Sequence, residues 1–162
     1  MNIMKYKESL LLYSGNYNDE SIQPFVTDSN FFYMTKCDLP NVTVLVHNFK
    51  IYVFTNFGNK QFFDNESAIK HLLQVFPGCS LHNESQLQER VRSLNIKKVL
   101  TLKTSKESKS IKSLNITLDY DTLEKICSQM RLVKTPQEIQ MITKACKVTA
   151  SAVRYLQKNI KP

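Results

Sequence analysis

The sequence predicts an α/β fold: a three-layer domain with a mixed β-sheet flanked by helices, followed by a long C-terminal helix. Segments with strand patterns alternate with segments of helical period, as is typical of layered α/β proteins. Two neighbouring strand segments near the N-terminus indicate a hairpin, which makes the sheet mixed rather than purely parallel. Near the C-terminus apolar side chains recur at helical spacing without a break, which predicts a helix of about 23 residues.

Several segments in the first third of the chain are predicted to be strands. Residues 9–14 (SLLLYS) form an apolar run that ends at Gly15, as expected of a buried strand. Residues 42–46 and 50–55 are rich in β-branched and aromatic side chains, and the three residues between them indicate a turn. Further strands are predicted over the aromatic residues 31–35 and over residues 61–63.

The middle of the chain changes to helical period. Apolar side chains recur every three or four residues up to the helix stop at Pro77 and Gly78. Asn83 and Gln86 have the spacing of a capping box, and they precede a second helical pattern. The chain beyond is predicted to form a strand over 96–102, an exposed Lys/Ser-rich loop over 104–113, a strand over 114–118 and a helix over 119–130.

The last helix has the clearest start in the chain. Thr135 is a favourable N-cap, Pro136 suits the first helical position, and Glu138 completes a capping box. An apolar stripe follows, and an apolar stripe of this length needs a surface to cover. We expect the partner-facing residues of this stripe to be Ile139, Ile142, Ala145, Thr149, Ala152, Val153 and Leu156.

The composition argues against two classes of binding site. The chain of 162 residues has only three glycines, Gly15, Gly58 and Gly78, so it contains no glycine-rich phosphate-binding loop. The net charge is +8, but only four of the 22 basic residues are arginine, the residue best suited to bidentate phosphate and base recognition. Biased codon usage therefore explains the many lysines better than nucleic-acid binding does.

One lysine-rich segment is a candidate surface for an anionic partner. We favour a solvated loop over a binding site, because charge runs usually face water. Binding through such a segment would weaken as the salt concentration rises. The segment contains Lys97, Lys98, Lys103, Lys106, Lys109 and Lys112.

The four cysteines, Cys37, Cys79, Cys127 and Cys146, have no metal-binding or redox spacing. They predict reduced and mostly buried thiols in a cytoplasmic protein. Cys79 has His82 nearby in the sequence, but no third residue is identified that would orient the pair for catalysis. The chain has no secretion-signal pattern and no apolar run near the ~20 residues that cross a bilayer, so we expect no membrane partner.

The sequence assigns no catalytic and no metal-ligating residue. A two-metal hydrolase needs carboxylates and a histidine that converge on one pocket. His47, His71 and His82 are isolated in the sequence and match no paired-histidine motif. Asp119 and Asp121 stand at the start of a predicted helix, where N-capping explains them better than metal binding.

Two stretches resemble a known family. The first is residues 24–35 (PFVTDSNFFYMT), followed by Asp38-Leu39-Pro40 and the strand at 43–46; the second begins at residues 130–139 (MRLVKTPQEI) and continues to Pro162. Both resemble segments of the Xaa-Pro aminopeptidase (aminopeptidase P) and prolidase family. The first is similar to a motif of the N-terminal creatinase-like domain. The second is similar to the junction with the catalytic domain and that domain's first helix.

The resemblance implies two parts. Residues 1–130 would form the creatinase/aminopeptidase-P-like N-terminal domain, and residues 131–162 the linker and first helix of a truncated pita-bread catalytic domain. In the family that catalytic domain holds two metal ions, usually manganese, on two aspartates, one histidine and two glutamates. Proline-containing peptides are substrates of the full-length enzyme. We therefore expect this chain to hold no cofactor and to have no peptidase activity alone.

The resemblance also implies a role and partners. Such an N-terminal domain shapes the mouth of the active site and contributes to oligomerisation, with the catalytic domain or a second copy of the chain as its partner. A second hypothesis makes the chain a stand-alone protein-interaction module on the same fold. A creatinase-like domain without catalysis also occurs in a histone-chaperone subunit, so the scaffold can serve binding alone. The apolar stripe of the last helix would then be the interface.

Overall fold

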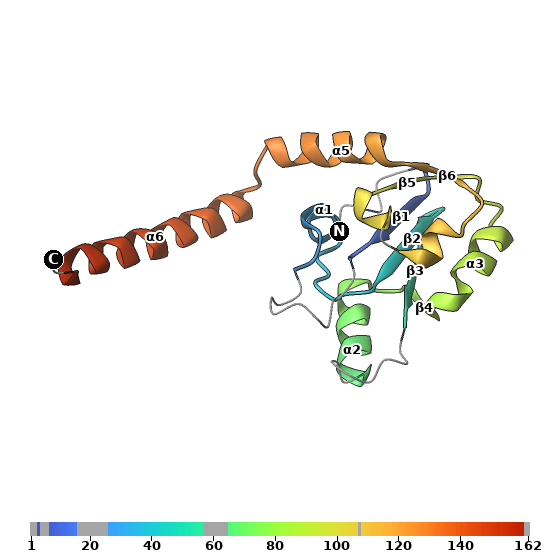
Figure 1. The fold of residues 1–162 in the computed structure, drawn as a ribbon, viewed down its shortest axis with the longest axis horizontal. Helices are drawn as coiled ribbons and strands as arrows, with labels where there is room; N and C mark the ends of the chain where they lie inside the picture. The colour runs from blue at the N-terminus through green and yellow to red at the C-terminus, as the bar shows by residue number, and fades with distance from the viewer. Residues whose placement is uncertain (1–2, 4–6, 16–25, 57–64, 107, 161–162) are drawn as a thin grey trace. The chain divides into compact units, whose positions relative to one another are not determined.

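The computed structural model describes residues 3, 7–15, 26–56, 65–106 and 108–160. The chain divides into two compact units, Met1–Cys127 and Ser128–Pro162. The first unit contains a β-sheet with helices, and the second contains the long helix α6 (Pro136–Asn159) (Figure 1). No helix in these described ranges is long and apolar enough to cross a membrane.

The described residues of the first unit contain one six-stranded sheet with the order β4-β3-β2-β1-β5-β6 (Figure 1). β1 pairs antiparallel with β2, and β2 pairs antiparallel with β3. The pairs β3–β4, β1–β5 and β5–β6 are parallel, so the predicted mixed sheet is confirmed. The strands are β1 (Leu10–Tyr13), β2 (Thr43–His47), β3 (Lys50–Thr55), β4 (Ser80–Asn83), β5 (Lys98–Thr101) and β6 (Thr117–Asp119).

The predicted hairpin is the pair β2–β3. His47 pairs with Lys50, so Asn48 and Phe49 form a two-residue connection. Both have positive φ, 48° and 61°, as a type I′ turn requires. Asparagine tolerates this conformation, whereas a phenylalanine in the second position carries a steric cost that glycine would avoid. The strand predicted at 61–63 lies outside the described residues.

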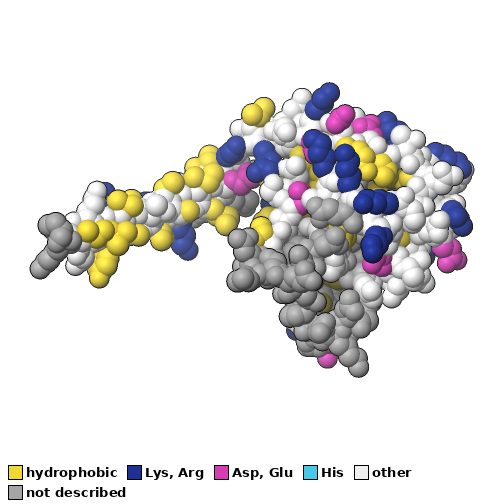
Figure 2. All heavy atoms as spheres, viewed as in Figure 1, with side chains coloured by type: hydrophobic (Ala, Val, Ile, Leu, Met, Phe, Trp, Pro, Cys, Tyr) yellow, Lys and Arg dark blue, Asp and Glu magenta, His cyan; other side chains and the backbone are white. Residues whose placement is uncertain are grey.

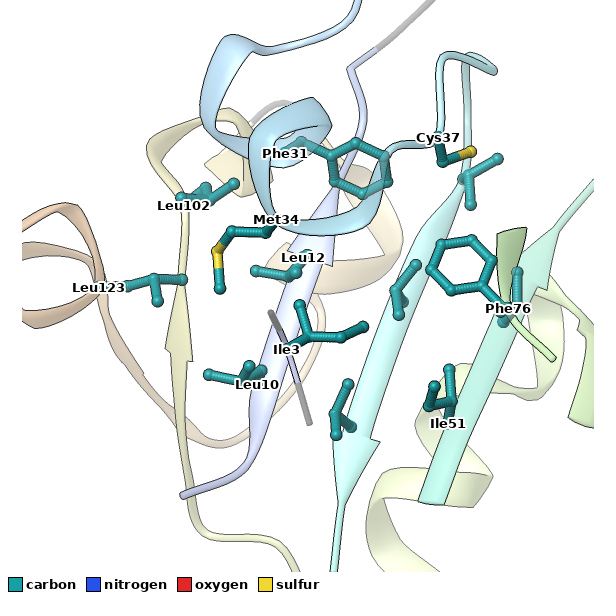
Figure 3. Packing of buried hydrophobic residues seen from close by; sticks show 14 of the residues in the cluster. Ile3, Leu10, Leu12, Phe31, Met34, Cys37, Ile51, Phe76, Leu102 and Leu123 are labelled. Atoms are coloured by element: carbon teal, nitrogen blue, oxygen red, sulfur yellow. The ribbon is translucent and has the colours of Figure 1, made fainter. Parts of the chain in front are cut away.

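Side chains of the sheet alternate between two hydrophobic cores. In β1, Leu10 and Leu12 belong to one core, and Leu11 and Tyr13 to the other. The first core packs against α1, α2 and α5 (Figure 3), and the second against α3 and α4. Helices on both faces of one sheet confirm the predicted three-layer α/β fold. They are α1 (Ser29–Thr35), α2 (Asn65–Val75), α3 (Leu87–Ser93), α4 (Lys109–Lys112) and α5 (Tyr120–Leu132).

Residues 31–35 lie in helix α1, so the strand predicted there is wrong. Asp28 is the N-cap, and its Oδ1 accepts hydrogen bonds from the N–H groups of Asn30 (3.0 Å) and Phe31 (2.8 Å). Phe31 is fully buried, whereas its neighbour Phe32 is exposed. The aromatic content favoured a strand, but the capped first turn and the burial of one helix face stabilise a helix instead.

α1 ends at Lys36 in an unusual backbone conformation. The φ of Lys36 is 64°, in the left-handed region, and its N–H donates to the carbonyl of Phe32 (2.8 Å). Glycine adopts this conformation with the least steric cost, and it is the commonest residue at such a helix end. Lys36 Nζ lies 5.0 Å from the ring centroid of Tyr33, which places the ammonium over an aromatic face.

Residues 104–113 are also not the exposed loop that the sequence predicted. They contain most of the short helix η3 (Lys103–Lys106) and all of α4. Ser108 caps α4 by accepting a hydrogen bond from the N–H of Ile111 (3.2 Å). Ile111 and Ser105 are buried. The lysines exposed between these residues made the segment resemble a solvated loop in the sequence.

Two predicted helix starts are confirmed. Asn83 and Gln86 form the capping box of η2 (Glu84–Gln86), which leads into α3. Asp119 accepts a hydrogen bond from the N–H of Thr122 (3.1 Å), as expected of the cap of α5. Strand β4 was not predicted, because its sequence is short and none of its residues is fully buried.

Candidate interaction surfaces

Helix α6 begins as the sequence predicts. Thr135 Oγ1 accepts a hydrogen bond from the N–H of Glu138 (3.2 Å), and the Glu138 carboxylate accepts one from the N–H of Thr135 (2.8 Å). Pro136 occupies the first turn. The reciprocal cap satisfies N–H groups that have no partner inside the helix. The start of α6 is therefore encoded by four consecutive residues.

The apolar stripe of α6 is exposed. α6 has no buried side chain, and Ile139, Ile142 and Leu156 are each exposed to half or more of their surface (54%, 50% and 52%). Figure 2 shows apolar side chains along this helix. Among the described residues of Ser128–Pro162 there is no second complete helix that could cover them. The other stripe residues are Ala145, Thr149, Ala152 and Val153.

α6 carries a second apolar row that sequence analysis missed. Met141, Val148 and Tyr155 follow one another at intervals of seven residues, and each is exposed. The seven-residue spacing, close to two helical turns, was the available signal. Basic side chains occupy the remaining side of the helix at Lys144, Lys147, Arg154 and Lys158.

Ion pairs engage part of the lysine-rich segment. Lys98 Nζ lies 2.8 Å from the Asp119 carboxylate, and Lys103 Nζ lies 2.6 Å from the Glu124 carboxylate. The hydrogen bonds from Lys98 and from Thr122 lower the pKa of Asp119 to about 2. The hydrogen bond to Glu124 raises the pKa of Lys103. These two ammonium groups already have anionic partners in the fold.

The remaining lysines of the segment lie on several elements of the fold. Lys106 Nζ lies 4.7 Å from the ring centroid of Tyr120, in a cation–π contact. Lys97 precedes β5, whereas Lys109 and Lys112 lie on α4, and all three are exposed. In the described ranges no acid forms an ion pair with them.

The histidines do not converge on one site. His47 Nδ1 lies 2.7 Å from Ser9 Oγ, and His71 Nε2 lies 3.2 Å from the Asp38 carboxylate. His82 lies on β4 rather than in the loop that the sequence indicated. The described residues contain no group of three or more His, Cys, Asp or Glu side chains that could hold a metal.

The environment of His82 is aromatic and cationic. Its ring stacks on Phe54, with the ring centroids 5.3 Å apart, and lies 6.0 Å from Tyr52. Arg90 lies over the Tyr52 ring, 5.2 Å from its centroid. Burial, followed by the charge of Arg90, lowers the pKa of His82 against the opposing hydrogen bond of Gln86. The neutral ring is therefore suited to packing at this position.

The four cysteines form no disulfide. Burial raises the pKa of Cys37 to about 11, and burial also raises the pKa of Cys79. A nucleophilic or metal-binding cysteine needs a lowered pKa, because the thiolate is the reactive form. These two thiols are thus suited to packing. Cys127 is also buried, whereas Cys146 is exposed on α6.

Comparison with known proteins connects the fold to solved structures only. No protein-family model and no curated protein matches the sequence. The structure is similar to an aminopeptidase P from Escherichia coli with the inhibitor Pro-Leu (TM-score 0.70, 15% identity), covering 99% of this chain and 43% of that one. It is also similar to an Xaa-Pro dipeptidase from Bacillus anthracis, with a TM-score of 0.64 and 16% sequence identity. This match covers 96% of this chain and 39% of the dipeptidase. A third similar structure is a putative aminopeptidase P from Bacillus anthracis, with a TM-score of 0.60 and 18% sequence identity. This match covers 85% of this chain and 39% of that protein.

The likeness establishes the fold of the chain. The chain spans about two fifths of the length of these structures and corresponds to their N-terminal part. The resemblance recognised in the sequence is thereby confirmed at the level of fold. Sequence identities of 15–18% carry no function from those proteins to this one.

Proposed function

We propose that this chain is the non-catalytic N-terminal part of an Xaa-Pro aminopeptidase/prolidase-like protein. The observation that carries the proposal is coverage: 99% of this chain matches only 43% of the Escherichia coli aminopeptidase P. In this proposal the domain covers residues 1–130, and residues 131–162 belong to the junction with a catalytic part. The domain would shape the active-site mouth and mediate oligomerisation, in a cytoplasmic protein whose thiols stay reduced.

The described polar residues support a structural rather than a chemical role. Three of the carboxylates accept hydrogen bonds from backbone N–H groups at helix starts: Asp28, Asp119 and Glu138. Glu124 forms an ion pair with Lys103. A dinuclear metal centre needs such carboxylates to converge on one pocket, so these residues do not fit one. Manganese and proline-containing peptides, in this proposal, belong to the catalytic part.

An assay of peptide hydrolysis tests the proposal. The purified 162-residue chain is incubated with an Xaa-Pro dipeptide and Mn²⁺, Zn²⁺ or Co²⁺, and released proline is measured. We expect the rate to equal the background rate of the metal alone. An active aminopeptidase P in the same buffer serves as the control for the assay. Turnover that requires the metal and disappears with a chelator would overturn the proposal.

A second candidate function is a stand-alone protein-interaction module on the same fold. The exposed apolar stripe of α6 favours it, because large exposed apolar surfaces usually mark contact sites. Light scattering combined with binding of a hydrophobic dye tests for such a surface. A monomer that binds no dye would argue against it. The nucleotide sequence beyond codon 162 distinguishes the two functions, since an in-frame set of aspartate, histidine and glutamate ligands would favour the first.

A further inference from the structure

Helix α6 contains a regular repeat that includes five stripe residues and Cys146. Six residues are separated by alternating intervals of three and four, which is the heptad pattern of helices that pair with one another. We call these six residues the seam and assign them alternately to heptad positions a and d. The seam consists of Ile139, Ile142, Cys146, Thr149, Val153 and Leu156.

The basic residues of α6 avoid the seam and the positions beside it. The basic residues Lys144, Lys147, Arg154 and Lys158 all fall at heptad positions b or f, on the outer side of the helix. The flanking positions e and g hold Glu138, Thr143, Ala145, Ala150, Ala152, Gln157 and Asn159. Among them only Glu138 is charged, and its carboxylate bonds Thr135 within the same chain.

This charge pattern permits a second copy of the same helix as the occupant of the seam. A helix that carried lysines at its flanks would repel an identical helix, whereas uncharged flanks allow two copies to meet. Alanines at three flanking positions let the helix axes approach toward the short end of the usual range of about 8–10 Å. The surface of α6 is therefore compatible with α6 of a second copy of this chain.

We propose that α6 pairs antiparallel with α6 of a second copy through the seam. An antiparallel pair places a positions opposite d positions, so Ile139 meets Leu156 of the second copy and Ile142 meets Val153. Cys146 meets Thr149 at the centre. Large side chains then pair toward both ends and the two small ones pair in the middle, while the helix dipoles oppose each other. The proposal rests on the second candidate function, in which the apolar stripe of α6 is the interface, and it names a second copy of the chain as the partner.

Light scattering after size exclusion tests the pairing with the full 162-residue chain. The chain mass is 18.8 kDa, and the dimer would have twice this mass. Val153→Glu places a charge in the seam and should restore the mass of one chain. Val148→Glu makes the same substitution in the second apolar row and should leave the dimer intact. Far-UV circular dichroism checks that both variants keep their helix.

Disulfide trapping tests the direction of the two helices. In the antiparallel pair the two Cys146 residues are offset by about 4.5 Å along the axis, which carries their Cα atoms beyond the ~7 Å reach of a disulfide. Thr149→Cys brings the new thiol level with Cys146 of the other copy, so mild oxidation should cross-link this variant. The unchanged chain, and Thr149→Cys combined with Cys146→Ser, should not cross-link.

Each result decides between clear alternatives. A monomer at every concentration, equal effects of the two glutamate variants, or efficient cross-linking of unchanged Cys146 would overturn the antiparallel pair. A monomer that binds hydrophobic dye would overturn the antiparallel pair, but α6 would remain a contact surface for another partner. Metal-dependent peptide hydrolysis would instead overturn the proposed function and would not bear on the pairing.

Discussion

Truncation of Phe31 tests the packing of helix α1. Phe31 is fully buried in the first core, whereas the adjacent Phe32 is 43% exposed. Figure 3 shows Phe31 among the side chains of Leu12, Met34 and Cys37. Phe31→Ala should therefore destabilise the first unit strongly, and Phe32→Ala should have a small effect.

The expected magnitude follows from the buried area. A buried phenylalanine removes about 150–250 Å² from water, which at about 25 cal/mol per Å² corresponds to roughly 4–6 kcal/mol. Core Phe→Ala substitutions cost about 3–5 kcal/mol, because neighbouring side chains relax only partly into the cavity. We expect about 4 kcal/mol for Phe31→Ala and less than about 1 kcal/mol for Phe32→Ala.

Urea unfolding provides the measurement. The chain contains no tryptophan, so near-UV circular dichroism of tyrosine is the natural probe. Tyr13 and Tyr52 are buried in the second core and report on the first unit rather than on α6. Stability differences come from the shift in midpoint at constant slope. Equal shifts for Phe31→Ala and Phe32→Ala would refute the assignment of α1 as a helix with one buried face.

Three further substitutions test local features of the structure. Phe49→Gly should raise the melting temperature, since glycine relieves about 1 kcal/mol of cost at the positive φ of the hairpin turn. Thr135→Ala should lower the far-UV helical signal by removing a cap worth about 1 kcal/mol, while the tyrosine transition stays in place. Lys98 holds the pKa of Asp119 at about 2, below its ordinary 3.8. The ionised Asp119 carboxylate therefore stabilises the fold fully above pH 3.8, and this stabilisation is lost as the pH falls toward 2. When the free energy of unfolding is measured against pH, the Asp119→Asn variant should lack this loss.

Features that depend on neighbouring residues could be predicted from the sequence. The capping boxes at Asn83 and Thr135 each involve side chains only three positions apart, so their residue types indicated the helix starts. The hairpin was predictable from two β-branched segments with a short connection. The apolar stripe of α6 followed from periodicity alone. Its exposure in the structure did not.

Features that depend on distant contacts required the tertiary structure. Phe31 lies in a helix because a core formed by other elements buries one face of α1. The aromatic composition of the segment does not predict this burial. Ile111 is buried between exposed lysines because α4 packs on the second core. Lys98 lies beside Asp119 only because β5 and β6 are parallel neighbours.

The sequence by itself determined the mixed α/β architecture, the resemblance in fold and the long amphipathic helix, because periodicity and capping are local properties of a chain. The tertiary structure decided which residues remain available for binding. It paired Lys98 and Lys103 with Asp119 and Glu124, and it left the apolar stripe of α6 without a cover within its own unit. Burial and charge pairing depend on residues far apart in the sequence, so only the folded chain fixes them.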